Sequence, residues 1–363
     1  MLQPEAIVDF NSLNHNYSTI KARVGSSKIM AVIKADAYGH GAIHIAKALT
    51  KVGAHGFCVA LVQEAKELLE SNINNPVLHL GSLSDSSLEI YKSGQVRCTI
   101  SSLEDIQSLE KSKLTKIIAH LKVDTGMGRL GYDYQDLELI LNILQKSKKI
   151  KVEGVYSHFA TAEDINTTYR DLQLKRFNKS ILLVKKILSD VKYFHIANSA
   201  AILNCKESHF NMVRPGITMY GVSPLGYPDS TLKPVLTLKA KVALVKSFKT
   251  NSSIGYGRLY ITRQIENIAT LQIGYADGIP IKYFNGGEVE INDQLFPLVG
   301  KVSMDLSTIK CFDSKLNKGD EATFWGGENM NLRLENIAKM FDMIPYELLT
   351  GLSMRVKRTY INA

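Results

Sequence analysis

The chain has little cysteine, and its four cysteines are far apart in 363 residues. They form no CxxC pair and no Cys/His cluster, as their positions show: Cys58, Cys98, Cys205 and Cys311. Zinc sites and disulfide frameworks both need cysteines grouped at characteristic intervals, so this spacing argues against each of them. We therefore expect reduced cysteines with a structural role, and no metal site.

Long apolar runs are absent as well. No run approaches the roughly 18 to 20 residues of a membrane-spanning helix, and the first ten residues, MLQPEAIVDF, lack the basic start and apolar stretch of a secretory signal. The sequence therefore predicts a cytoplasmic protein with no membrane partner. Because 45% of its residues are hydrophobic, it can bury a large core, as one big domain with a smaller one or as two of ordinary size.

The net charge is +9, but the positive residues are scattered. The densest run is KSKKIK at residues 146–151, which is typical of a solvated helix end and loop. A nucleic-acid surface would need a basic patch or stripe, so we expect no nucleic-acid partner. A phosphate-bearing small molecule needs only a local positive or amide-lined pocket.

From about residue 29 to 220, short β-branched or apolar runs alternate with amphipathic helical stretches. This alternation predicts parallel strands joined by crossover helices. About eight strands are expected, the number that closes a TIM-like (β/α)8 barrel. They are KIMAVI, GFCVAL, PVLHLG, VRCTIS, KIIAHLKV, VEGVYS, YFHIAN and MVRPGITM. Among the helix signals, Ser102 followed three residues later by Asp105 is a weak capping box.

After about residue 230 the pattern changes to alternating runs such as LKAKVALVKSF, separated by turns rich in Gly or Asn. We predict a barrel over residues 1–230 and a mainly-β domain over residues 231–363, with one helix in NLRLENIAKMF. The first strand, AIVDF, precedes the first barrel helix and could instead join the second domain.

Polar residues gather just after the predicted barrel strands. The carboxyl ends of the strands form the working face of such a barrel. Lys34 follows the first strand, and Lys122 and Arg129 bracket the glycine-rich turn after the fifth. His158 follows the sixth strand, Asn198 and Ser199 follow the seventh, and Arg214 lies in the eighth, before Pro215 and Gly216. A single lysine in this position is ordinarily salt-bridged or snorkelling. The alternative is an amine desolvated enough to form a Schiff base.

The surroundings of Lys34 favour the Schiff-base interpretation. The amides of Gly216 and Ile217, with the hydroxyls of Ser199 and Tyr38, would form a phosphate cradle in the same barrel mouth. A Schiff-base lysine that faces a phosphate cradle indicates pyridoxal 5'-phosphate (PLP).

Eight motifs, in one consistent order over nearly the whole chain, resemble the signatures of the bacterial alanine racemases, a PLP-dependent family of fold-type III. They are AVIKADAYGHG (31–41), HLKVDTGMGRLG (120–131), GVYSHFATAED (154–164), HIANSAA (195–201), VRPGITMYG (213–221), IGYGR (254–258), IGYADG (273–278) and GKVSMD (300–305). The resemblance implies interconversion of L-alanine and D-alanine, which supplies D-alanine for peptidoglycan. It also implies a homodimer whose active sites each use residues of both chains.

By this resemblance Lys34 and Tyr256 are the two catalytic bases, because racemisation removes a proton from one face of the substrate and returns one on the other. Tyr256 would come from the partner subunit. A tyrosine hydroxyl with its ordinary pKa of ~10 is a poor base at neutral pH, so it needs neighbouring hydrogen bonds and positive charge. His158 and Arg214 match the residues that provide them. Arg214 also matches the donor to the pyridine nitrogen of PLP, and since arginine keeps its proton, that nitrogen stays largely unprotonated.

Other matched positions have binding or supporting roles. Arg129 would contact the phenolic oxygen of PLP and the substrate carboxylate. Lys122 matches a lysine that is often carbamylated; as a carbamate it would hold Arg129, and as an ammonium it would need a counter-charge such as Asp124. The remaining matches are Asn198 near the cofactor, Met304 and Asp305 from the partner chain, and Tyr275 at the substrate entrance.

Two positions depart from the family pattern. Met354 stands where some relatives have a tyrosine that contacts the phosphate, and Ile281 stands where many have a basic residue near the entrance. Two alternatives to a strict alanine racemase remain. One is a PLP amino-acid racemase of broader specificity, and the other is a non-catalytic PLP-binding or carrier protein that would need neither a second domain nor Tyr256.

Overall fold

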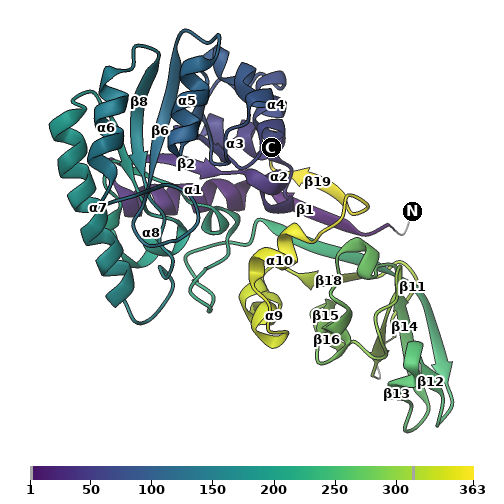
Figure 1. Cartoon of the computed structure of the whole chain (residues 1–363). Coiled ribbons are helices and arrows are strands. Elements are labelled where there is room, and N and C mark those ends of the chain that lie inside the picture. Colours follow the sequence, from purple (N-terminus) through teal and green to yellow (C-terminus); the bar gives the residue numbers. More distant parts are fainter. Residues whose placement is uncertain (1–2, 313–314) are drawn as a thin grey trace. The chain divides into compact units, whose positions relative to one another are not determined.

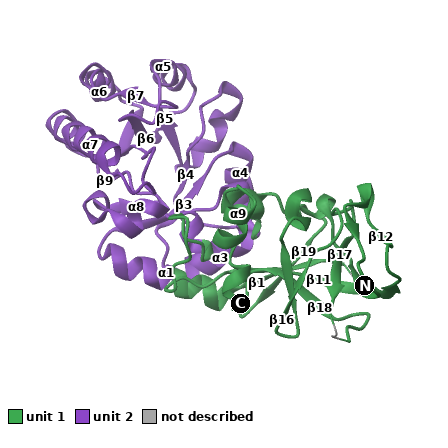
Figure 2. Ribbon diagram, turned by 90° about the horizontal axis from the view of Figure 1, so that it is seen from below, with its two compact units in different colours: residues 1–16, 38–40, 220–363 green, residues 17–37, 41–219 purple. Residues whose placement is uncertain are grey.

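The computed structural model describes residues 3–312 and 315–363. The chain forms two compact units, unit 1 with residues 1–16, 38–40 and 220–363, and unit 2 with residues 17–37 and 41–219 (Figure 2). The order of the elements can be followed by colour in Figure 1. None of the helices described has both the length and the apolar character that crossing a membrane requires.

Unit 2 contains the predicted barrel. Its eight main strands are parallel and correspond to the eight apolar runs of the sequence. In sheet order they are β10 (Met212–Val213), β2 (Lys28–Val32), β3 (Gly56–Val59), β4 (Val77–His79), β5 (Val96–Ile100), β6 (Ile117–Asp124), β8 (Ile150–Tyr156) and β9 (Tyr193–His195), with the short β7 (Tyr132–Asp133) beside β6. The Arg214 amide donates to the Ala197 carbonyl at 3.0 Å and ties the last strand to its neighbour. The TIM-like barrel is therefore confirmed.

Helices lie around the outside of these strands (Figure 2). They are α1 (Phe10–Val24, from residue 17 onward in this unit), α3 (Ala42–Lys51), α4 (Val62–Glu70), η1 (Asp85–Ser93), α5 (Leu103–Lys111), α6 (Leu137–Lys146), α7 (Thr168–Ile187) and α8 (Ser199–Asn204). The capping box at α5 is confirmed, because Ser102 Oγ accepts from the Asp105 amide at 3.2 Å and Asp105 Oδ2 accepts from the Ser102 amide at 2.9 Å. In α3, Ile45 and Leu49 share one fully buried face.

Unit 1 is built on a mainly antiparallel sheet, which confirms the mainly-β second domain. Its strands are β1 (Glu5–Asp9), β11 (Leu236–Phe248), β14 (Glu266–Leu271), β15 (Glu288–Ile291), β16 (Gln294–Pro297), β17 (Ser307–Cys311), β18 (Glu321–Trp325) and β19 (Lys357–Ile361). The AIVDF strand, β1, lies in this sheet between β11 and β19, with Ala6 opposite Leu238 and Arg358. A small hairpin, β12 (Ser253–Ile254) and β13 (Tyr260–Ile261), carries the IGYGR motif.

Two short helices cover part of this unit, where the sequence analysis expected one. The expected helix is α9 (Leu334–Met340), and it is followed by α10 (Pro345–Thr350). Proline opens α10 in the first turn, where its missing N–H costs nothing. The six-residue length of α10 leaves too little periodicity for the sequence pattern to reveal it.

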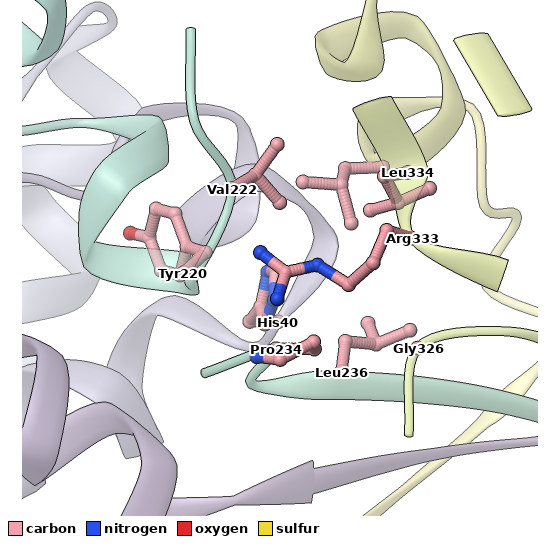
Figure 3. Close-up of a pocket in the computed structure, with 9 residues that line it drawn as sticks. His40, Tyr220, Val222, Pro234, Leu236, Gly326, Arg333 and Leu334 are labelled. Atoms are coloured by element: carbon pink, nitrogen blue, oxygen red, sulfur yellow. The ribbon is translucent and has the colours of Figure 1, made fainter. Parts of the chain in front are cut away.

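A small cavity of about 10 Å³ lies inside unit 1, with His40 and Arg333 pointing into it (Figure 3). It has room for about one water molecule, so it is not a substrate site. The Arg333 guanidinium donates to the carbonyls of Gly221 at 2.9 Å and Leu232 at 3.2 Å, and it pairs with the buried Glu335 at 3.2 Å. These bonds tie the chain segment after residue 220 to α9.

Gly221 is expected to tolerate no side chain. Its φ is +81°, and a Cβ added there would lie 1.8 Å from the Lys233 carbonyl oxygen. Gly226 has nearly the same φ, +80°, with nothing within 4 Å of an added Cβ. Gly226→Ala should therefore lower the free energy of unfolding by about 1 kcal/mol, the cost of the backbone conformation alone. Gly221→Ala should lower it by roughly 3 kcal/mol or more, because the overlap forces the backbone to move.

Urea unfolding followed by circular dichroism measures both variants. Equal losses of stability for Gly221→Ala and Gly226→Ala would show that the close approach of Gly221 to Lys233 contributes nothing.

Candidate active site

Lys34 follows β2 directly and opens an unusual turn. The turn, α2 (Lys34–Gly39), has φ values of 51°, 52°, 54° and 54° at Ala35, Asp36, Ala37 and Tyr38. It is therefore left-handed, a conformation that costs an L-residue about 1–2 kcal/mol because Cβ crowds the following carbonyl oxygen. Strain of this kind persists only where the surroundings impose it, and it is concentrated at functional sites.

Glu64 holds the start of the turn. Its Oε1 accepts from the Ala35 amide at 2.6 Å, while its Oε2 accepts from the amides of Ala60 and Leu61 at 2.8 and 3.0 Å. One carboxylate thus caps α4 and fixes the residue next to Lys34. Glu64 was not predicted from the sequence, although it follows β3 closely and the strand-end rule that selected Lys34 also applies to it.

Four cations converge near His158. Burial first, and then Arg214, Arg129, Lys122 and Lys34, lower the pKa of His158 to about 3. Burial, followed by Arg129 and Arg214, also lowers the pKa of Lys122 from 10.5 to about 8. The structure therefore brings five residues, predicted at the ends of four strands, into one electrostatic neighbourhood. At neutral pH the imidazole of His158 is uncharged.

Asp124 is the carboxylate that acts on Lys122, but its oxygens are engaged elsewhere. They accept from the amides of Gly126, Met127 and Gly128 at 2.8, 2.8 and 2.9 Å, which shapes the glycine-rich turn after β6. Arg129 is exposed, and its guanidinium has no hydrogen bond or ion pair with any residue for which the structure gives a position. The positive neighbourhood is thus poorly compensated within the barrel.

Ser199 and Gly216 lie together on the same side of the barrel. The buried Ser199 Oγ accepts from the Gly216 amide at 2.9 Å, from the Thr218 amide at 3.3 Å and from the Thr218 hydroxyl at 3.0 Å. Asn198 caps α8, because its Oδ1 accepts from the Ala201 amide at 3.1 Å. Ile217, fully buried, opens the short helix η3 (Ile217–Tyr220). Thr218 was not predicted from the sequence.

Tyr38 belongs to unit 1. Its ring centroid lies 5.2 Å from that of Tyr220 and 5.8 Å from that of Tyr346, so its orientation is fixed by aromatic packing.

The predicted residues of the second domain gather on neighbouring loops of unit 1. The amide of Tyr275 donates to the Ser303 carbonyl, and the amide of Ala276 donates to the Met304 carbonyl, both at 3.0 Å. A Cβ added at Gly300 would lie 2.8 Å from the Ile254 carbonyl oxygen, so the IGYGR and GKVSMD motifs are also in close contact. Asp305 pairs with Arg355 at 2.7 Å.

Several of these side chains face solvent in the single chain. Tyr256 is 71% exposed, Met304 52% and Tyr275 40%. The two departures from the family pattern are also exposed, with Met354 at 99% and Ile281 at 43%. Such large exposed apolar side chains on one loop cluster are typical of a surface that another protein covers.

Over residues 3–312 and 315–363, the structure contains no group of three or more His, Cys, Asp or Glu side chains that could hold a metal ion. The four cysteines are free and buried.

Two family models match the chain, one after the other. Residues 8–224 match the family model "Alanine racemase, N-terminal domain", and residues 235–360 match "Alanine racemase, C-terminal domain". The alanine racemase of Carboxydothermus hydrogenoformans is 39% identical, with 98% of this chain and 99% of the relative aligned. Alanine racemase 2 of Caldanaerobacter subterraneus subsp. tengcongensis is also 39% identical, with 98% and 94% aligned.

Solved structures agree with the sequence comparison. Alanine racemase from Clostridium difficile 630 superposes with a TM-score of 0.91 at 33% identity and covers 99% of this chain and 96% of its own. The Bacillus anthracis alanine racemase with bound L-Ala-P has a TM-score of 0.90 at 32% identity and covers 100% and 96%.

The Lys122 ammonium is expected to destabilise the folded chain. Its folded pKa of about 8 lies below the ordinary 10.5, so its cost is fully present below about pH 8 and fades as the pH rises toward the ordinary value. Lys122→Met should therefore raise the free energy of unfolding at about pH 7, with a smaller gain at about pH 10. Urea unfolding in buffer freed of carbon dioxide, which keeps the amine unmodified, measures the difference.

The exposed Lys148 supplies the control, since Lys148→Met removes a charge without removing a buried one. If both variants behave alike at each pH, the like-charge repulsion inferred at Lys122 is wrong.

Proposed function

The chain belongs to the alanine racemase family and is an enzyme of that family, and from this premise we propose the cofactor, the catalytic groups and the assembly with which it interconverts L-alanine and D-alanine. The proposal depends above all on one observation: Arg214 lies 3.4 Å from His158 and, like Lys122, contacts the Tyr156 ring. Lys34 and Arg129 add to the positive charge that lowers the pKa of His158. An anionic cofactor and a substrate carboxylate supply the negative charge that this neighbourhood lacks.

The residues around the barrel mouth fit PLP. Among the residues described, the buried Ser199 Oγ accepts three hydrogen bonds and donates none, which leaves its proton for an anionic oxygen. Ser199, Gly216 and Ile217, with Tyr38, would hold the phosphate, and Lys34 would hold the cofactor through its amine. The others in the proposed set are Asn198 and His158 beside the cofactor, Arg214 at its ring nitrogen and Arg129 at its phenolic oxygen.

PLP, when bound, withdraws electrons from the substrate Cα and makes its proton acidic. Lys34 and Tyr256, on opposite faces, would then remove that proton and return one from the other side. Arg214 keeps its proton and so leaves the ring nitrogen largely unprotonated. Nδ1 of His158 lies 3.4 Å from Nη2 of Arg214 and can accept a hydrogen bond from it. The other ring nitrogen of His158 would then donate to the Tyr256 phenol.

The substrate contacts and the entrance complete the proposal. Arg129 would bind the alanine carboxylate, with Met304 and Asp305 contributed beside it, and Tyr275 would narrow the entrance. As a carbamate, Lys122 would become the anion that holds Arg129. Its lowered pKa of about 8 raises the fraction of neutral amine, which can attack the carbon of carbon dioxide and lose a proton to give the carbamate. A cytoplasmic location and the supply of D-alanine for peptidoglycan stay predictions.

We propose that Tyr256, Met304 and Asp305 act in the site of a partner subunit, in a homodimer with shared active sites. Their loop cluster is exposed in the single chain, with Tyr256 at 71%, Leu259 at 59% and Met304 at 52%. The non-catalytic carrier has no use for this cluster and is not favoured. A racemase of broader specificity shares the chemistry and differs only at the entrance.

The PLP-reconstituted protein is expected to form D-alanine from L-alanine, with much slower turnover of serine and lysine. Lys34→Ala and Tyr256→Phe should each lower kcat by about 100-fold or more, because each removes one of two proton-transfer groups. Tyr227→Phe, at another exposed tyrosine, is the control and should keep full activity. A chiral assay of both alanine enantiomers measures all three variants.

Full activity in Tyr256→Phe would remove Tyr256 as the second base. Turnover of several amino acids would favour the broader racemase, and a PLP-loaded protein that racemises none of them would favour the carrier.

Shared sites predict that two inactive variants rescue each other. When Lys34→Ala and Tyr256→Phe chains are mixed at random, half of the dimers are hybrids, and each hybrid has one site with both bases intact. The mixture should reach about a quarter of wild-type activity, after unfolding and refolding together or by co-expression. Sites contained within single chains predict no rescue, which would refute the shared arrangement while leaving the racemase activity in place.

A further inference from the structure

A row of buried polar side chains runs from Arg214 into the barrel. The Arg214 Nη1 lies 2.5 Å from Nδ1 of His195, and Nε2 of His195 lies 2.8 Å from Nδ1 of His120. Nε2 of His120 in turn lies 3.8 Å from the Glu153 carboxylate, an electrostatic contact longer than a hydrogen bond. We call these four residues the inner row. His120 and Lys122 are two residues apart in β6, so the row lies on the same strand face as the cation cluster.

The chemistry of the two ends allows only one arrangement of protons. Arginine can only donate, so Nδ1 of His195 must accept and its proton must be on Nε2. That N–H faces Nδ1 of His120, which must also accept, so the His120 proton is on Nε2 and faces Glu153. A carboxylate can only accept. Every proton in the inner row therefore points from Arg214 toward Glu153.

Packing holds both imidazole rings in these orientations. A Cβ at Gly154 would lie 2.7 Å from the His120 ring, so the ring occupies the space that any other residue in this position would fill. The His195 ring stacks on Tyr156 at a centroid distance of 5.0 Å and an interplanar angle of 0°. Tyr156 is itself anchored by a 2.8 Å hydrogen bond between its hydroxyl and Thr99.

Glu153 stays ionised at the far end. The facing His120 ring, and then Arg97 with its 2.9 Å ion pair, lower the pKa of Glu153 to about 2 against the opposing effect of burial. Burial lowers the pKa of both histidines, so both are neutral at neutral pH. The negative charge of Glu153 is thus connected to Arg214 through two neutral rings.

We propose that Glu153, acting through His120 and His195, is a positioning residue for Arg214. Together with the carbonyls of Ser157 and His195, which accept from Nη2 at 2.7 Å and from Nη1 at 3.2 Å, it fixes which guanidinium N–H is left for the ligand in the barrel mouth. This inference rests on the proposed function only for the identity of that ligand group, the ring nitrogen of PLP. The inner row also provides an ionised carboxylate for a cluster that has few others.

The test reads the proton positions directly. In ¹⁵N-histidine-labelled, PLP-reconstituted protein, two-bond ¹H–¹⁵N correlation spectra show which ring nitrogen carries the proton, with assignment from His120→Asn and His195→Asn. Both histidines should be neutral with the proton on Nε2. In Glu153→Gln, the His120 and His195 signals should move, the ring-nitrogen signal of ¹⁵N-labelled PLP should shift, and kcat should fall roughly tenfold with a smaller change in KM.

Arg97→Gln is the matched control. It removes the same ion pair but keeps the Glu153 carboxylate facing His120, so it should leave the histidine and PLP nitrogen signals in place. If Arg97→Gln reproduces the effects of Glu153→Gln, the carboxylate acts only through the ion pair and the proposal is wrong. Unchanged signals in Glu153→Gln, or a proton on Nδ1 of His195, would overturn it as well.

A second variant covers the case in which Glu153→Gln does not fold. His120→Asn keeps an acceptor oxygen facing His195 but cuts the connection to Glu153, so the PLP nitrogen signal should shift while His195 keeps its proton on Nε2. An unshifted PLP signal in this variant contradicts the proposal. The histidine protons can be read without cofactor, so failure to bind PLP or to racemise alanine would refute the proposed function separately.

Discussion

Like-charge repulsion at the carboxyl end of the barrel is the constraint on which the rest of the site depends. Lys34, Lys122, Arg129 and Arg214 all act on His158, and Asp124 is committed to the amides of its own turn. The chain limits the repulsion by keeping His158 neutral and by lowering the pKa of Lys122. The Tyr156 ring adds a cation–π contact with Lys122 at 5.5 Å and another with Arg214 at 5.1 Å. An anionic ligand would neutralise the remaining positive charge. The cluster therefore lowers the stability of the chain without a ligand and strengthens the binding of an anion.

The left-handed turn after Lys34 also lowers the stability of the folded chain, next to the cation cluster. Four consecutive non-glycine residues with φ above 50° store several kcal/mol by the usual estimate of ~1–2 kcal/mol each. Glu64 offsets part of this by fixing the first of them, Ala35, through the same carboxylate that caps α4. The position of Lys34 is therefore set by the contact between two neighbouring βα units, and not by its own segment alone.

Most of the fold was predictable because its signals are local. Alternating apolar runs revealed all eight barrel strands, and Ser102 revealed the start of α5. The strand-end rule then selected Lys34, Lys122, His158 and Arg214, since the carboxyl ends of parallel strands meet at one face. Residues of unit 1 such as Tyr256 came only from the family resemblance, because an antiparallel sheet has no equivalent rule that places a site.

The features that the sequence analysis missed depend on contacts between distant segments. The sequence ADAY contains no glycine to signal a left-handed turn, and Glu64 reaches it from another helix. The roles of His120 and Glu153 follow from contacts between residues that are far apart in the sequence. His120 contacts His195, which is 75 residues away, and Glu153 pairs with Arg97, which is 56 residues away. No periodicity within one element encodes such pairs.

The inner row lowers the stability of the barrel interior relative to apolar side chains in the same positions. Barrel interiors are ordinarily filled by branched apolar side chains, and replacing a buried polar or ionic group by apolar residues of similar volume is often neutral or stabilising. A polar network is tolerable inside a protein only when every member has its partner. Here both nitrogens of His195 and Nδ1 of His120 have hydrogen-bond partners, and Nε2 of His120 has the Glu153 carboxylate as an electrostatic partner at 3.8 Å. The row ends in Arg214, which cannot change its protonation. Stability alone would have favoured valine or leucine at these positions. What the polar row provides instead is a guanidinium held in a fixed orientation, and we interpret the row as serving function.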